Sequence, residues 1–216
     1  WNDEKTKKWQ EYYYSDKNPM VDHVLERQKK SLKFLESLKL KPGSKILELG
    51  YGGGQTAKKI LELGFNYTGV DISNHLKESA ERKCVNFVKN NKAKFIVGNI
   101  DNDLEFHHGQ FDVVLVMGAL QYITDPNKCF KEVNRVLKVN GHFIVCQANM
   151  YAFILEIFNL RRFMTRVIYL LFREKYVIST SFKGILTQSK MSKFFKKYEN
   201  SKFMNTKFML KGDPEW

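Results

Sequence analysis

The chain has 216 residues, of which 43% are hydrophobic, and it carries 36 lysines and arginines against 23 aspartates and glutamates, a formal net charge of +13. This length suits one domain, and seventeen phenylalanines and ten tyrosines can fill a core, which excludes a wholly disordered chain. Three scattered cysteines exclude a disulfide framework and offer no metal cluster, so we expect no metal and a reducing, cytoplasmic location.

The positive charge is distributed unevenly. Residues 151–216 hold 13 lysines and arginines against 5 acidic residues, a net charge of +8, so this last third carries most of the excess. A basic excess suits nucleic acid, anionic lipid or an anionic small molecule, and composition alone does not choose among them.

The predicted elements alternate along the chain. A basic, aromatic opening precedes a helix over 21–38, and Pro42-Gly43 then breaks the chain. The predicted strands are Lys45–Leu49, Tyr67–Val70, Lys94–Val97, Phe111–Met117 and Gly141–Ala148. The predicted helices between them are Gln55–Leu63, Asn74–Lys89 and Asn127–Leu137. Strands separated by helices of this length predict parallel βαβ units in a doubly wound α/β sheet.

A glycine-rich turn follows the first predicted strand. Gly50, Gly52 and Gly54 let the backbone turn sharply and let a ligand approach main-chain atoms. Gln55 stands where a dinucleotide fingerprint needs glycine or alanine, and the Gly-Lys-Ser/Thr of a P-loop is absent. Glu48, just before the turn, would repel a phosphate. The turn therefore favours a cationic or amino-bearing ligand.

Acidic residues end the next two strands. Asp71 lies about twenty residues past the glycine turn, where nucleoside-binding sheets hold a ribose diol. A second interpretation is that Asp71 or Ser73 only caps the following helix. Asp101, after the third strand, is suited to accept from an adenine amine, although Asn99 and Asp101 are also common turn residues.

These segments together resemble the class I S-adenosylmethionine-dependent methyltransferases, over roughly Leu40 to Ala148, and look closest to the branch that methylates quinones, sugars and lipids. The motifs that carry the resemblance are Glu48-Leu49-Gly50-Tyr51-Gly52-Gly53-Gly54, Val70-Asp71-Ile72-Ser73, Gly98-Asn99-Ile100-Asp101, Phe111-Asp112-Val113-Val114 and Leu137-Lys138-Val139-Asn140-Gly141-His142. The family implies a Rossmann-like, mostly parallel sheet of seven strands. Because the residues up to Trp216 offer no obvious last antiparallel strand, we expect that edge to be truncated or abbreviated.

The resemblance implies S-adenosyl-L-methionine as cofactor. It would place Glu48 and the glycine turn against the methionine part, Asp71 on the ribose hydroxyls and Ile72 on the adenine ring. Ile100 and Asp101 would contact the edge of the adenine ring. The backbone of Met117 and Gly118, after the fourth strand, would contact the methionine part. The implied cofactor-binding residues are Glu48, Gly50, Gly52, Gly54, Asp71, Ile72, Asn99, Ile100, Asp101, Met117 and Gly118.

The acceptor side is less defined. Tyr122 stands where many relatives have histidine, so an imidazole base is not carried over, and a phenol with an ordinary pKa of about 10 is a poor base at neutral pH. Tyr122 is thus a weak catalytic candidate that more readily packs or lines the pocket. The candidate substrate-contacting residues are Tyr12, Tyr13, Tyr14, Tyr122, Arg161 and Arg162. The three N-terminal tyrosines predict either a lid over the cofactor or packing on the sheet edge.

The single domain divides into four parts, namely an N-terminal lid and helix (1–40), a cofactor-binding core (41–150), a substrate cap (151–186) and a C-terminal helix and strand (187–216). The stretch 151–172 is a basic amphipathic helix, with too many charges to span a membrane. It predicts either a helix that covers the sheet or contact with an inner membrane surface and a lipid-linked anionic acceptor.

The leading hypothesis is a methyltransferase acting on a small molecule by in-line displacement. The sequence lacks the Asn/Asp-Pro-Pro motif of amino methylases of nucleic acids, the Pro-Cys of pyrimidine C5-methylases and the paired glutamates of arginine methyltransferases, which disfavours nucleic-acid partners. An RNA or protein methyltransferase that uses the basic last third is the first alternative. A cofactor-binding partner protein without catalysis is the second. Oligomeric state is not predicted.

Overall fold

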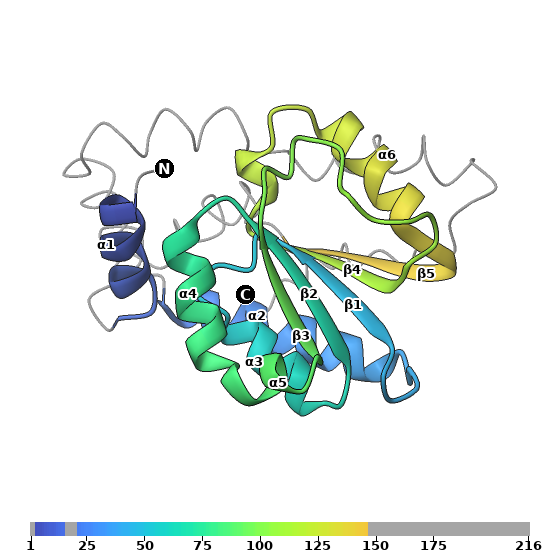
Figure 1. The fold of residues 1–216 in the computed structure, drawn as a ribbon, viewed down its shortest axis with the longest axis horizontal. Coiled ribbons are helices and arrows are strands. Elements are labelled where there is room, and N and C mark those ends of the chain that lie inside the picture. Colours follow the sequence, from blue (N-terminus) through green and yellow to red (C-terminus); the bar gives the residue numbers. More distant parts are fainter. Residues whose placement is uncertain (1–2, 16–20, 147–216) are drawn as a thin grey trace, which may run out of the picture.

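The computed structural model describes residues 3–15 and 21–146, and the elements below belong to those ranges (Figure 1). The strands are β1 (Lys45–Leu49), β2 (Asn66–Asp71), β3 (Ala93–Val97), β4 (Phe111–Met117) and β5 (Leu137–Cys146). The helices are α1 (Asp3–Tyr13), α2 (Val21–Ser37), α3 (Gln55–Glu62), α4 (Asn74–Lys83), α5 (Val85–Lys89), the 3₁₀ turn η1 (Leu120–Tyr122) and α6 (Pro126–Val136).

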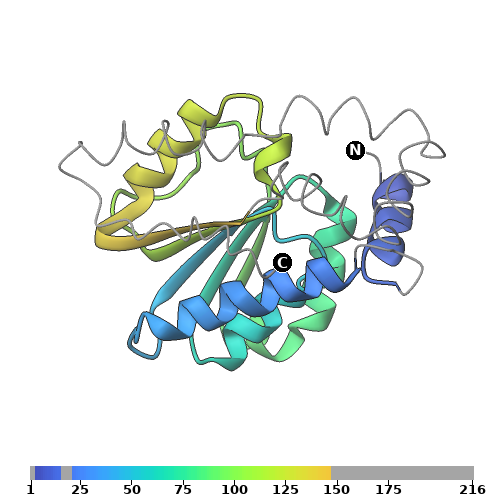
Figure 2. The same ribbon diagram turned by 180° about the vertical axis from the view of Figure 1, so that it is seen from behind.

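The strands form one parallel sheet in the order β3-β2-β1-β4-β5. Helices α2 to α5 cover one face and α6 lies on the other, as Figures 1 and 2 show. Side chains alternate between two hydrophobic clusters: Ile46 of β1 packs with Leu35 and Ile60 of the helices on one face, and Leu47 packs with Phe130 and Val133 on the other. The predicted doubly wound α/β sheet is confirmed, with five of the expected strands in the described part.

Three local features differ from the sequence-based prediction. The predicted helix Asn74–Lys89 breaks at the buried Cys84, which leaves helical geometry and separates α4 from α5. Strand β5 begins at Leu137 rather than Gly141, and its register against β4 shifts near Asn140, which has a positive φ of 63°. The aromatic opening also forms α1, which its residue pattern did not predict. The parts predicted for 151–186 and 187–216 lie outside the described residues.

The connection from β3 to β4 replaces a helix with a loop, residues 98–110, that is tied to α6 by Arg135. The Arg135 guanidinium donates to the backbone carbonyls of Leu104, at 2.8 Å, and Phe106, at 2.7 Å, and it also pairs with Glu132. Glu132 in turn accepts from the Leu104 N–H at 2.8 Å. This ion pair therefore adds hydrogen bonds to the loop backbone, whose Leu104 carbonyl also accepts from the Phe106 N–H at 2.7 Å.

We expect Arg135→Met to lower the free energy of unfolding by roughly 1–3 kcal/mol, because the carbonyls of Leu104 and Phe106 and the Glu132 carboxylate each lose the hydrogen bond from the guanidinium. Urea denaturation measures the change. Lys131→Met on the same helix is the matched control, since Lys131 is exposed and its loss should change stability by less than about 0.5 kcal/mol. Equal stability of the two variants would contradict the role of Arg135.

Candidate functional site

The carboxyl ends of the parallel strands meet at one edge of the sheet. The strand order reverses between β1 and β4, so the segments after these two strands diverge there, which is where open α/β sheets bind ligands. Glu48 lies near the end of β1, Asp71 at the end of β2 and Met117 at the end of β4. The sheet thus brings together the predicted cofactor-binding residues of three strands.

The glycine turn after β1 depends on glycine for both conformation and packing. Gly50 and Gly54 have positive φ angles of 82° and 77°. A Cβ atom on Gly50 would lie 2.5 Å from the Cβ of Ala119, and one on Gly54 would lie 2.8 Å from Ala80. Gly52 differs, because no described atom lies within 4 Å of the position of its missing Cβ. The turn is therefore packed at both ends and open in its middle.

Asp71 holds this turn in place. Its Oδ2 accepts from the Gly52 N–H at 2.9 Å and its Oδ1 from the Ser73 N–H at 3.3 Å. Burial raises the pKa of Asp71, and these backbone N–H groups oppose that shift. The cap of α4 is Ser73, whose Oγ accepts from the Leu76 N–H at 3.3 Å. Of the two residues considered as caps of this helix, Ser73 is the N-cap, whereas the Asp71 carboxylate binds the glycine turn.

Glu48 is buried beneath the same turn. Its side chain is 2% exposed, and the Tyr67 hydroxyl donates to its Oε2 at 2.5 Å. Burial raises the pKa of Glu48 to about 7, and the Tyr67 hydrogen bond and the Arg27 charge oppose this shift. The site therefore contains a carboxyl group that titrates near neutrality.

The residues predicted for the adenine side are arranged less uniformly. Ile72 is 53% exposed just past β2 and presents an apolar surface. Asn99 accepts from the Asp101 N–H at 2.9 Å, as a turn residue does, and Asp101 Oδ1 accepts from the Thr124 N–H at 2.8 Å. Ile100 packs against the cluster on the α6 face. Asn99 and Asp101 thus have structural hydrogen bonds of their own.

The segment after β4 contributes backbone rather than charge. Gly118 has a φ of 74° and donates its N–H to the Cys146 carbonyl at 2.7 Å, which joins the ends of β4 and β5. Tyr122 ends the 3₁₀ turn and is 40% exposed.

The N-terminal helices cover this edge of the sheet. The Gln10 amide of α1 donates to Ser79 Oγ of α4 at 2.8 Å, and a Cβ atom on Gly53 would lie only 2.1 Å from the Gln10 nitrogen. Helix α1 therefore lies over the glycine turn. At its end, Tyr13 and Tyr14 are partly buried, whereas Tyr12 is 39% exposed. The lid interpretation of these tyrosines remains a prediction.

Arg27 of α2 is a site residue that the sequence analysis did not identify. It donates to the Tyr13 hydroxyl at 2.6 Å, and its guanidinium lies where a side chain on Gly118 would stand, 2.5 Å from the missing Cβ. A signal was present, because Val24, Gln28 and Ser31 form a buried stripe at helical spacing beside Arg27. Arg27 provides a cation directly at the carboxyl edge.

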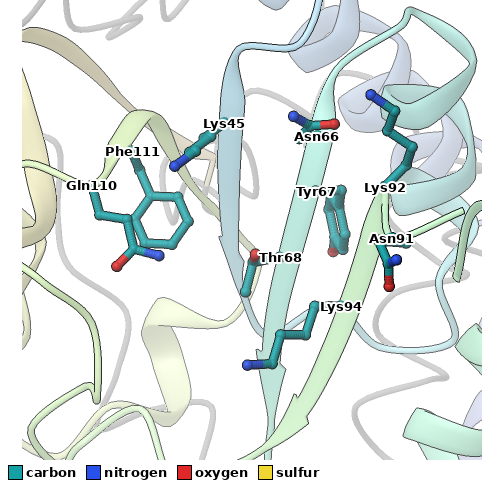
Figure 3. A pocket seen from close by; sticks show the side chains of 10 residues that line it. Lys45, Asn66, Tyr67, Thr68, Asn91, Lys92, Lys94, Gln110 and Phe111 are labelled. Carbon is teal, nitrogen blue, oxygen red and sulfur yellow. The ribbon is translucent and has the colours of Figure 1, made fainter.

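A cavity of about 240 Å³ lies elsewhere, at the amino ends of the strands (Figure 3). Lys45, Lys92 and Lys94 line it together with polar side chains that include Thr68 and Gln110. None of the predicted site residues lines this cavity, although Tyr67, whose hydroxyl donates to Glu48, is one of its lining residues. Arg161 and Arg162, predicted to contact substrate, lie outside the described residues.

Comparisons with known proteins agree with this geometry. A family model described as a methyltransferase domain matches residues 47–145. A sterol 4-C-methyltransferase of Caenorhabditis elegans is 32% identical over 110 residues, covering 51% of this chain and 33% of that protein. A ubiquinone/menaquinone biosynthesis C-methyltransferase of Rickettsia typhi is 34% identical over 107 residues, covering 47% and 43%.

The chain thus spans between a third and a half of the length of these curated relatives. Among solved structures, a candidate S-adenosyl-L-methionine-dependent methyltransferase from Methanococcus maripaludis has a TM-score of 0.62, with 92% of this chain and 83% of that chain covered. Its identity of 14% shows the fold alone. The strand order, the glycine turn and the matched family agree, and residues 47–145 belong to the class I S-adenosylmethionine-dependent methyltransferases.

Proposed function

We propose that this protein transfers a methyl group from S-adenosylmethionine to a small-molecule acceptor. The observation that carries the proposal is the arrangement at the carboxyl edge, where an open glycine turn lies between two buried carboxyl groups, Glu48 and Asp71, and one cation, Arg27. A phosphate-bearing cofactor would meet these carboxylates at close range. A ligand with a sulfonium, an ammonium and a ribose diol meets complementary groups instead.

The residues present fit each part of this cofactor. The open space at Gly52 leaves room for a ligand against the backbone, and Asp71 retains carboxylate lone pairs that could accept from ribose hydroxyls. Ile72 offers an apolar surface for adenine. Arg27 would hold the methionine carboxylate, the one anionic part of the cofactor.

When bound, the sulfonium supplies a methyl group that needs no further activation. The protein then contributes alignment of the acceptor and exclusion of water. Helix α1 lies over the glycine turn and can shield the carboxyl edge of the sheet from water. The backbone of Gly118 lies close to the Arg27 guanidinium at the same edge. Transfer to a hydroxyl or a ring carbon also releases a proton from the acceptor, which a base or water must take up.

The acceptor that fits best is a lipid or lipid-linked ring. The relatives in the comparisons are named for sterol, menaquinone and ubiquinone methylation. The basic amphipathic pattern of 151–172 supports contact with an anionic membrane surface from which such an acceptor could be taken. In the described part of the chain, no helix has the length and hydrophobicity to cross a membrane.

The activity itself is tested by incubating the protein with S-adenosylmethionine and quinol or sterol acceptors and measuring S-adenosylhomocysteine. Formation of product that depends on the acceptor supports the proposal. Product with RNA only, with a strong loss at high salt, would instead favour the RNA alternative. Binding of cofactor without product for any acceptor would favour a non-catalytic partner protein.

We expect Asp71→Asn to weaken binding of S-adenosylhomocysteine by roughly 10- to 100-fold, because hydrogen bonds to a charged acceptor contribute about 1.5–3 kcal/mol. Calorimetry measures the dissociation constant. Asp103→Asn is the control, since this side chain is 84% exposed and forms only a surface pair with Lys128. Unchanged affinity in the Asp71 variant would refute its ribose role.

Arg27→Met tests the contact to the methionine carboxylate separately from the contact to the ribose. We expect it to weaken S-adenosylhomocysteine by about tenfold or more while leaving 5′-methylthioadenosine, which has no carboxylate, unchanged. Asp71→Asn should weaken both ligands, because both contain the ribose. Equal loss of both ligands in the Arg27 variant would show that Arg27 supports the fold rather than the carboxylate.

Replacement of Arg161, Arg162 and Arg166 by glutamine should reduce co-sedimentation with vesicles that contain anionic lipid, because each basic residue near such a surface contributes about 1 kcal/mol. Neutral phosphatidylcholine vesicles are the control and should bind the parent and the variant equally. If the parent protein does not bind anionic vesicles, the membrane-contact proposal is wrong.

A further inference from the structure

Tyr67 is a buried residue that the proposed reaction does not use. Its hydroxyl donates to Glu48 Oε2 at 2.5 Å, and the residue is 2% exposed. The ring packs against Phe95, with centroids 5.5 Å apart, and Phe95 also contacts the Tyr51 ring at 5.2 Å. Glu48 therefore lies above an aromatic cluster, and Tyr67 is the member of that cluster that contacts its carboxyl group.

The sheet is built to admit this contact. Gly69 pairs with Glu48 in the register of β1 and β2. A Cβ atom on Gly69 would lie 2.9 Å from the Tyr67 hydroxyl oxygen and 2.6 Å from the Tyr51 ring. A larger residue at position 69 would displace both rings, so the glycine preserves the space in which the tyrosine hydroxyl reaches Glu48.

The groups that act on the charge of Glu48 come from α2, from β2 and from the turn after α1. Arg27 of α2 favours its ionised form, Asp71 of β2 opposes it, and the phenol of Tyr14, in the turn after α1, lies near enough to interact with it. The Tyr67 hydroxyl can only donate to Glu48 while the latter accepts, so it stabilises the carboxylate. A neutral Glu48 and a charged Glu48 therefore present different surfaces to a cationic ligand.

We propose that Tyr67 is a positioning residue that directs Glu48 toward the cofactor's cationic group and stabilises the carboxylate that binds it, and that cofactor binding releases the proton that Glu48 carries in the empty site at lower pH. This inference rests on the proposed function. Tyr67, which lies in β2 and outside the glycine turn, would then determine the pH range in which the site binds its ligand.

The direction of the coupling follows from the charges. Burial raises the pKa of Glu48 to about 7, so the empty site holds a proton there below that pH. A bound ammonium group favours the carboxylate and lowers this pKa, so ligand affinity rises with pH up to about 7 and then levels off. Loss of the Tyr67 donor raises the pKa of Glu48 further and moves this midpoint to higher pH.

The experiment is calorimetric titration of S-adenosylhomocysteine between pH 5.5 and 8, in buffers of different ionisation enthalpy. In the parent protein we expect affinity to rise by up to about tenfold per pH unit below the midpoint, with release of up to one proton. Tyr67→Phe should shift the midpoint to higher pH. Tyr51→Phe, which removes a buried hydroxyl of the same cluster that has no hydrogen-bond partner in the described part, should not. Glu48→Gln should abolish this pH dependence.

A measurement without ligand separates this inference from the proposed function. With its folded-state pKa above the unfolded value, Glu48 stabilises the fold at low pH, and this stabilisation is lost as pH rises towards and through 7. The melting temperature of the empty protein should therefore fall relative to Glu48→Gln between about pH 4.5 and 7, and in Tyr67→Phe this fall should continue to higher pH.

The outcomes distinguish the two ideas. Absence of S-adenosylhomocysteine binding at every pH would refute the proposed function and the coupling, while the melting curves would still show whether Tyr67 controls the proton on Glu48. Binding with the same pH dependence in the parent, Tyr67→Phe and Glu48→Gln would leave the proposed function intact and refute the coupling.

Discussion

The hydrogen bond from the Gly52 N–H to the Asp71 carboxylate is the interaction on which the rest of the site depends. Two residues earlier, the Gly50 N–H donates to the Val70 carbonyl at 2.8 Å. The end of β2 therefore holds the glycine turn after β1 by two hydrogen bonds. The turn stays open in its middle because its ends are fixed by the neighbouring strand and by close packing on Ala80 and Ala119. A ligand that binds there meets a preformed backbone surface.

This arrangement concentrates negative charge in a buried place, which opposes folding. Asp71 offsets part of the cost through backbone donors, and Glu48 does so through Tyr67 and the nearby Arg27. Neither carboxyl group is neutralised by a direct ion pair among the described residues. The negative charge of Glu48 and Asp71 is therefore available to a cationic ligand. The two carboxyl groups lower the stability of the fold but strengthen the binding of such a ligand.

The fold was predictable because its signals are local. Apolar strands, helical spacing and a glycine turn predicted the α/β order and brought Glu48 and Asp71 to one edge. The break at Cys84 and the start of β5 at Leu137 depend on tertiary packing and strand pairing, which local patterns do not contain. Arg27 and Tyr67 were missed for the same reason, since their roles arise only when α2 and β2 approach β1.

The net charge of +13 does not conflict with a cationic cofactor, because distance separates the charges. Lys45, Lys92 and Lys94 lie around the cavity at the amino ends of the strands, whereas Glu48 and Asp71 lie at the carboxyl ends. Glu48 lies three residues after Lys45 in β1, about 10 Å along the strand, which is roughly one Debye length at physiological ionic strength. The side chains of Lys45, Lys92 and Lys94 are exposed, so solvent and salt weaken their electrostatic effect on the site more than that of the buried Glu48 and Asp71. The sheet itself keeps the two kinds of charge apart, so one basic protein can present an acidic binding edge.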